Sequence, residues 1–67
     1  MNYAIRFDFE GSGYAWAGLT PDGSYGIAPT LLTAARFDDR ETAQRTLDNA
    51  YGPSLAECGE VREVGGL

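Results

Sequence analysis

One segment in the second half of this chain restricts the fold most, because it carries helix signals at both ends. Asp38 is a strong N-cap candidate, and Glu41 three residues later completes a capping-box pattern. Gly52 stands where a left-handed residue ends many helices, and Pro53 prevents the helix from continuing. The sequence therefore predicts one helix between these signals, over about residues 39–51.

The apolar residues of this helix recur at the spacing of a single helical face, which indicates that this face covers the rest of the fold. They are Ala43, Leu47, Ala50 and Tyr51. The opposite face carries Glu41, Gln44, Arg45 and Asp48. Glu41 precedes Arg45 by four residues, which is the favourable orientation for an ion pair on a helix surface.

The first strand is predicted from strict alternation near the N-terminus. Its apolar positions are Tyr3, Ile5, Phe7 and Phe9, and they alternate with Ala4, Arg6, Asp8 and Glu10. Residues 11–13 (Gly-Ser-Gly) are typical of a hairpin turn, and residues 14–20 of a second strand. We expect Tyr14 and Trp16 to pack beside the aromatic residues of the first strand.

The remaining segments carry weaker signals. Residues 21–23 (Pro-Asp-Gly) are a turn, and Pro29 makes residues 24–30 an edge strand, a bulge or an ordered loop. Residues 31–37 fit either a third strand or a helical turn, and we favour the strand because the segment ends in an aromatic residue beside the helix cap. The last segments are an irregular turn over 54–58, a short edge strand over 60–64 and a tail over 65–67.

These elements predict an α+β fold in one domain, residues 1–67, because the chain is near the size at which one core is only just sufficient. The expected architecture is an antiparallel sheet of three to four strands with one helix packed on one face, in the order β-β-(β)-α-β. One helix covers one face, so the other face is expected to stay open. That face would carry Ala4, Arg6, Asp8, Glu10, Ala15, Ala17 and Leu19.

The composition argues against catalysis and against a metal or cofactor. The chain has no His, so it lacks the usual base near neutral pH and the imidazole metal ligand. Cys58 is the only cysteine, and the neighbouring Glu57 and Glu60 oppose thiolate formation, which predicts an inert or partly buried thiol. The enzymatic alternative is a hydrolytic carboxylate pair such as Asp8 and Glu10, for which so small a chain offers little cleft.

Charge points to a protein partner. The chain has ten acidic residues and five arginines, which gives a net charge of −5. This balance disfavours direct binding of nucleic acid. The N-terminus lacks the layout of a signal peptide and no apolar run is long enough to span a bilayer, so we expect a mature cytoplasmic protein.

Four stretches of the chain resemble small proteins of phages and mobile elements. They are the Tyr-Ile strand in 3–9, the Trp-bearing strand in 14–18, the Ala-Arg-Phe-Asp-Asp-Arg-Glu-Thr-Ala lead into the helix within 35–51, and the closing Glu-Val-Arg-Glu-Val of 60–64. Within that group, a compact acidic chain of this length is similar to anti-CRISPR inhibitors of type I effector complexes. The resemblance implies a DNA mimic, whose carboxylates occupy a basic groove meant for target DNA.

The leading hypothesis is thus a non-enzymatic inhibitor whose acidic surface binds a CRISPR effector subunit and blocks recognition of target DNA. Its candidate partner-binding residues, which would replace phosphates against partner Lys and Arg, are Asp8, Glu10, Asp38, Asp39, Glu41 and Asp48. The alternative is a small structural or interaction module that forms a homodimer through the open face of its sheet.

Overall fold

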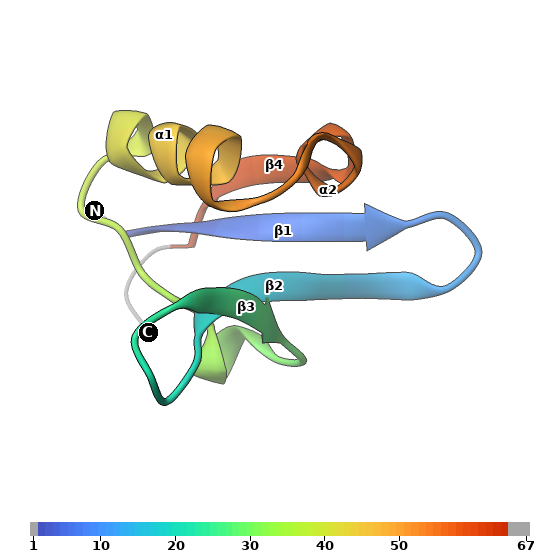
Figure 1. The fold of residues 1–67 in the computed structure, drawn as a ribbon, viewed down its shortest axis with the longest axis horizontal. Coiled ribbons are helices and arrows are strands. Elements are labelled where there is room, and N and C mark those ends of the chain that lie inside the picture. The colour runs from blue at the N-terminus through green and yellow to red at the C-terminus, as the bar shows by residue number, and fades with distance from the viewer. Residues whose placement is uncertain (1, 65–67) are drawn as a thin grey trace.

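A computed structural model describes residues 2–64 of the chain, which form a four-stranded antiparallel sheet with helices packed on it (Figure 1). The strand order is β3-β2-β1-β4, so β3 and β4 are the edges. In chain order the elements are β1 (Tyr3–Phe9), β2 (Gly13–Leu19), β3 (Tyr25–Ala28), the 3-10 helix η1 (Leu31–Thr33), α1 (Arg40–Ala50), α2 (Pro53–Cys58) and β4 (Gly59–Glu63). The α+β fold predicted from the sequence is confirmed.

The β1–β2 hairpin forms as predicted, but its register places the aromatic residues of β2 on the other face. Phe7 lies opposite Ala15, and Arg6 lies opposite Trp16. Residues opposite each other in an antiparallel pair share a face, so Trp16 lies on the face away from Phe7. The expected packing of Tyr14 and Trp16 beside the aromatic residues of β1 is therefore wrong. A register shift of one residue moves every side chain of a strand to the opposite face.

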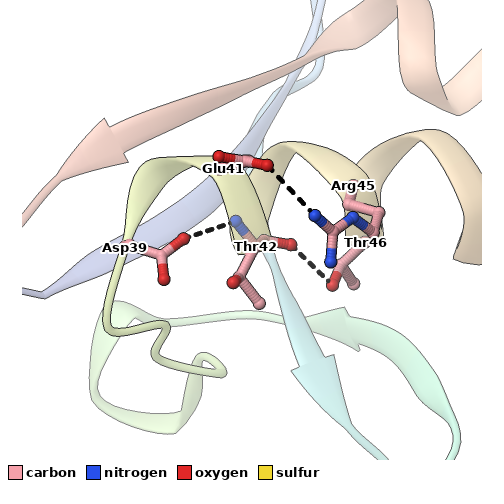
Figure 2. Close-up of polar contacts among 5 residues, drawn as sticks. All are labelled: Asp39, Glu41, Thr42, Arg45 and Thr46. Carbon is pink, nitrogen blue, oxygen red and sulfur yellow. Dashed lines mark hydrogen bonds and ion pairs between the residues drawn. The ribbon is translucent and has the colours of Figure 1, made fainter.

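The start of α1 lies one residue later than the capping-box pattern predicts. Asp39 is the N-cap, and its carboxylate accepts a hydrogen bond of 2.7 Å from the backbone N–H of Thr42 (Figure 2). Asp38 is exposed and precedes the cap, so it does not form the predicted box with Glu41. Two adjacent aspartates both suit an N-cap, and the one whose carboxylate reaches the amide three residues ahead takes the position.

The end of α1 also differs from the prediction. Tyr51, the C-cap, has extended backbone angles, and Gly52 has a φ of −69°, outside the left-handed region. Gly52 is the N-cap of a second helix, α2, and Pro53 occupies its first turn. Proline suits that position because its fixed φ matches a helix and its missing N–H is not needed there. The predicted irregular turn over 54–58 is thus a short helix.

The main core lies between the sheet and the two helices. Ile5 and Phe7 of β1 are fully buried, and the ring of Phe7 meets the ring of Tyr51 edge to face with centroids 4.9 Å apart. The buried residues of this cluster are Ile5, Phe7, Ala17, Phe37, Ala43, Leu47, Tyr51 and Val61. The predicted buried stripe of α1 is confirmed except at Ala50, which is exposed.

A second, smaller core lies on the opposite face, which is therefore not open as expected. Trp16, Ala4 and Ala28 are buried there, and Leu31 and Ala34 of the segment around η1 cover them. The smaller residues predicted for an open face are used in the two cores: Ala4 belongs to this one, whereas Ala15 and Ala17 are buried toward the helices. Leu19 alone of the predicted apolar set is exposed.

Residues 31–37 form a helical turn and a bridge rather than the strand that we favoured. After η1, the backbone N–H of Ala35 donates to the Ala17 carbonyl at 2.9 Å. Phe37 and Tyr3 then exchange two backbone hydrogen bonds of 2.9 Å each. The segment satisfies its backbone groups against the ends of β1 and β2, where the ladder between those two strands has stopped. The predicted tail over 65–67 lies outside the described residues.

Candidate binding surface

Among residues 2–64, three ion pairs determine where the net charge is displayed. They join Arg6 to Asp8 at 3.2 Å, Arg45 to Glu41 at 3.1 Å, and Arg62 to Glu60 at 2.7 Å. Each is partly or largely exposed, so each contributes little stability. Among residues 2–64, the carboxylates without an arginine partner are Glu10, Asp22, Asp38, Asp39, Asp48, Glu57 and Glu63.

The two other arginines contact the fold rather than these acids. The guanidinium of Arg36 donates to the backbone carbonyl of Leu31 at 2.9 Å. The guanidinium of Arg40 lies 5.3 Å from the ring centre of Tyr3, as in a cation–π contact, and donates to the Val61 carbonyl at 3.5 Å. The guanidinium of Arg36 is therefore directed at η1, and that of Arg40 at β1 and β4.

The first turns of α1 fix two of the candidate acids (Figure 2). The hydrogen bond from Thr42 to the carboxylate of Asp39 lowers the pKa of that carboxyl below its ordinary value, so Asp39 stays ionised at neutral pH. Glu41 accepts from Arg45 one turn later, which confirms the predicted pair. The hydroxyl of Thr46 donates to the Thr42 carbonyl at 3.0 Å and takes no part in the acidic surface.

Two further candidate acids lie on the same element. Asp38 is exposed directly before the cap, and Asp48 is exposed near the other end of α1. Asp48 accepts a hydrogen bond of 3.2 Å from the amide of Gln44, which leaves its negative charge in place. The rise of an α-helix puts Asp39 and Asp48 about 14 Å apart along the axis. Four of the six candidate residues thus follow one helix, and we call Asp38, Asp39, Glu41 and Asp48 the α1 acids.

The structure does not bring Asp8 and Glu10 to the α1 acids. Asp8 is near the far end of β1, and Glu10 is exposed in the following hairpin turn. Tyr3, where β1 meets the segment leading into α1, is separated from Asp8 by about 17 Å of extended strand. In Figure 1 the hairpin turn and the start of α1 lie at opposite ends of the molecule. Asp8 also points to the face of Trp16, because it pairs with Tyr14 across the hairpin.

A cluster that sequence reasoning missed surrounds Asp8. The guanidinium of Arg6 lies 4.1 Å from the ring centre of Tyr14, and the Tyr14 and Trp16 rings meet edge to face at 6.1 Å. Tyr14 is 55% exposed, whereas Trp16 is buried. These contacts depend on the hairpin register, so the alternation of β1 and β2 gives no signal for them. The positive charge of Arg6, which forms an ion pair with Asp8, offsets the charge of that carboxylate. This end of the sheet is therefore less acidic than α1.

The described residues also form a small hollow and expose a thiol. A hollow with a volume of about 280 Å³ lies between α1 and β3, lined by Tyr25, Arg45, Thr46, Asn49 and Ala50. It is at the lower limit of the size of small-molecule sites. Within residues 2–64, no three His, Cys, Asp or Glu side chains are placed to share a metal ion. Cys58 ends α2 and is exposed, so of the two predicted alternatives, an inert or a partly buried thiol, partial burial is wrong.

Comparison of the chain with known protein families, with curated proteins and with solved structures finds no match. In the part of the chain that the structure describes, no helix combines the length and the apolar character needed to cross a membrane. Fold and surface together define a small α+β protein with four acidic residues on α1 or directly before it.

Proposed function

We propose that this chain is a non-enzymatic inhibitor that binds the basic nucleic-acid-binding groove of a partner protein through the α1 acids. The observation that carries the proposal is the exposure of Asp38, Asp39 and Asp48 on one element without an arginine partner. Partner lysines and arginines would meet these carboxylates in charge-assisted hydrogen bonds. The net charge of −5 would also speed the encounter with a basic surface.

The spacing of negative charges along residues 38–48 resembles that along a DNA strand, but two arginines in the same segment reduce its net charge. One strand of duplex DNA carries a phosphate about every 3.4 Å along the axis, so about 14 Å of it presents roughly four charges. Residues 38–48 present four carboxylates over a similar length, together with Arg40 and Arg45. The spacing suits a groove built for phosphates, whereas the two arginines halve the local net charge. We therefore expect competition with DNA for the groove, at an affinity sensitive to each remaining acid.

The narrower proposal is that the groove belongs to a type I CRISPR effector complex in the cytoplasm of a host cell, as the resemblance to anti-CRISPR proteins implies. Binding there would block recognition of target DNA without any chemical step. In this arrangement Asp8, near the end of β1, and Glu10, in the hairpin turn, would act on the encounter rather than in the contact.

The test uses a purified type I effector complex, a fluorescent target duplex and this chain as competitor. We expect the chain to lower the anisotropy of bound DNA in a dose-dependent way. The variant D38N/D48N removes two negative charges at α1, and we expect it to inhibit at least about tenfold less well, since each lost charged hydrogen bond weakens binding substantially. Neither substitution touches the cap at Asp39.

The matched control is E10Q/E57Q, which removes the same amount of charge at the hairpin turn and on α2. We expect it to inhibit almost as well as the unchanged chain. Equal weakening by the two double variants would show that overall charge acts, and would exclude α1 as the contact. A chain that leaves DNA on the effector complex at every concentration would rule out the narrower proposal.

A further inference from the structure

The chain contains one Asp-Gly pair, Asp22 and Gly23, a sequence prone to spontaneous rearrangement of the main chain. The backbone nitrogen of the glycine attacks the side-chain carboxyl carbon of the aspartate, and no Cβ on the glycine hinders the approach. A C–N bond forms, the carboxyl C–OH bond breaks, and the amide proton leaves with the hydroxyl as water. Water then opens the resulting succinimide ring at either carbonyl, which gives aspartate or isoaspartate.

Burial does not protect this pair. Residues 20–24, which form the turn between β2 and β3, are all exposed. Gly23 has a φ of 90°, in the left-handed region that glycine adopts readily, and a Cβ built on it would meet nothing within 4 Å. Water therefore reaches the bond between Asp22 and Gly23, and protection has to come from contacts within the turn.

Hydrogen bonds engage both reacting groups in the closed turn. The backbone N–H of Gly23, which is the nucleophile once its proton is lost, donates to the Thr20 carbonyl at 2.9 Å. The carboxylate of Asp22, which would be attacked, accepts from the hydroxyl of Thr20 and from the backbone N–H of Ser24, the latter at 3.0 Å. Ring closure moves the Gly23 nitrogen onto the Asp22 carboxyl carbon, so the contacts of both groups have to break first.

Thr20 takes part in most of these contacts. Its carbonyl holds the Gly23 N–H, and its own backbone N–H donates to the Ser24 carbonyl at 2.8 Å. Its hydroxyl binds the Asp22 carboxylate and is the main cause of the lowered pKa of that carboxyl. The neutral acid is the reactive form, since an ionised carboxylate repels a nucleophile and loses no hydroxyl. The hydroxyl of Thr20 therefore lowers the fraction of Asp22 in the reactive form.

We propose that the bond between Asp22 and Gly23 is a latent modification site, which the closed turn keeps unreacted and which forms isoaspartate when the turn opens. Thr20 is the residue that keeps the turn closed. In isoaspartate the main chain runs through the former side-chain carboxyl and is one atom longer, so the hydrogen bonds of the turn no longer fit. β3 is an edge strand that pairs with β2. Conversion would therefore loosen β3 next to the turn.

The test measures isoaspartate in the whole chain during incubation at neutral pH, in buffer and in guanidinium chloride. Trypsin cleaves after arginine, so Asp22 is carried by the peptide of residues 7–36. Enzymatic methylation of isoaspartyl carboxylates gives the amount, and electron-transfer fragmentation assigns it to position 22 rather than to Asp8. We expect the rate in buffer to be at least about tenfold lower than the rate in denaturant, because only the open fraction of the turn reacts.

Two variants of Thr20 separate the effect of its hydroxyl from that of its shape. Thr20→Val removes the hydroxyl and keeps a branched side chain. We expect it to raise the rate in buffer at least about threefold, since a hydrogen bond to a charged group is lost. Thr20→Ser keeps the hydroxyl and should react almost as slowly as the unchanged chain. In guanidinium chloride all three proteins should react at the same rate, because no turn is left to protect them.

Asp39→Ala is the control for unfolding of the whole chain. It removes the side-chain cap of α1, so it lowers global stability without touching the turn. We expect its isoaspartate rate in buffer to equal that of the unchanged chain. As a second measurement, amide exchange on β3 should be faster in the purified isoaspartate form than in the unmodified chain.

Four results would overturn the proposal. They are equal rates in buffer and in denaturant, a T20V rate no higher than that of T20S, a D39A rate raised as far as that of T20V, and equal exchange on β3 in the modified and unmodified chains. The proposal does not rest on the inhibitor function, because Asp22 is not one of the α1 acids. Failure of one therefore leaves the other standing.

Discussion

Removing the hydroxyl of Tyr51 tests how the edge strand is held to the helices. In Tyr51→Phe the ring keeps its place, since Tyr51 is only 8% exposed and lies edge to face against Phe7. What is lost is the 2.7 Å hydrogen bond to the Gly26 carbonyl. A hydrogen bond of this kind contributes about 1 kcal/mol net to the free energy of unfolding. We therefore expect Y51F to be destabilised by about 1 kcal/mol.

That loss is large for a chain of this size. A domain of 67 residues has a free energy of unfolding of about 3–10 kcal/mol. A loss of 1 kcal/mol corresponds to a decrease of about 4–8 °C in Tm. Urea unfolding followed by the fluorescence of Trp16, the single tryptophan, measures the change directly. The m-value should stay the same, because the surface exposed on unfolding does not change.

The control is Tyr14→Phe. Tyr14 is largely exposed, and within residues 2–64 its hydroxyl forms no hydrogen bond with another protein group. We expect Y14F to change the free energy of unfolding by less than about 0.5 kcal/mol. Y51F should also speed amide exchange on β3, since that strand loses its tie to α1. A Y51F protein as stable as the unchanged chain, or a Y14F protein equally destabilised, would refute this reasoning.

Three further predictions follow from single residues. Burial raises the pKa of Tyr51, so the folded state favours the neutral form of its hydroxyl. The free energy of unfolding of the unchanged chain should therefore fall as pH rises above about 10. Y51F, which has no hydroxyl to ionise, should lack the part of this decrease that is due to Tyr51. Gly18→Ala would place a methyl 2.8 Å from the Ala28 Cβ and should cost about 1–3 kcal/mol in urea unfolding. Gly52→Ala meets nothing within 4 Å and should cost less, about 1 kcal/mol or below, because only the poorer N-cap preference of alanine at α2 is lost. Asp39→Ala should lower Tm and Asp39→Asn should not, because both Asp and Asn cap helices. Because the pKa of Asp39 is lowered in the folded state, the ionised carboxylate contributes to the free energy of unfolding at neutral pH. That contribution is lost as pH falls through the lowered pKa.

The elements of this fold were largely predictable, because their signals are local. The alternation of β1 and the stripe of Ala43 and Leu47 on α1 each require only neighbours along the chain. The face on which Trp16 lies was not predictable, since it depends on where the hairpin begins to pair. Phe9 pairs with Gly13, so Trp16 lies opposite Arg6 on the face away from Phe7, whereas a register shifted by one residue would place it beside Phe7.

The segment over 31–37 shows a second limit. Its composition fits a strand, but Leu31 packs on the Trp16 face, and only Phe37 makes a bridge to β1. The face that needs covering is created by the hairpin register, so the role of this segment follows from a tertiary contact. The expectation of an open sheet face failed for the same reason.

For the candidate surface, the sequence predicted the pairing of Glu41 with Arg45 but not the separation of Asp8 and Glu10 from the helix. The pair follows from the spacing of one helical turn. The separation depends on the direction of β1, whose start and not its end lies beside the segment that enters α1. Strand direction within a sheet has no local signal.

The salt dependence of binding tests the central claim most directly. The measurement is the dissociation constant of the unchanged chain with a purified type I effector complex, by interferometry at about 50 mM and about 300 mM salt. Contacts between exposed carboxylates and partner cations are screened over this range. We predict that the dissociation constant rises at least about tenfold. An affinity that stays the same at the two salt concentrations would contradict binding through the α1 acids.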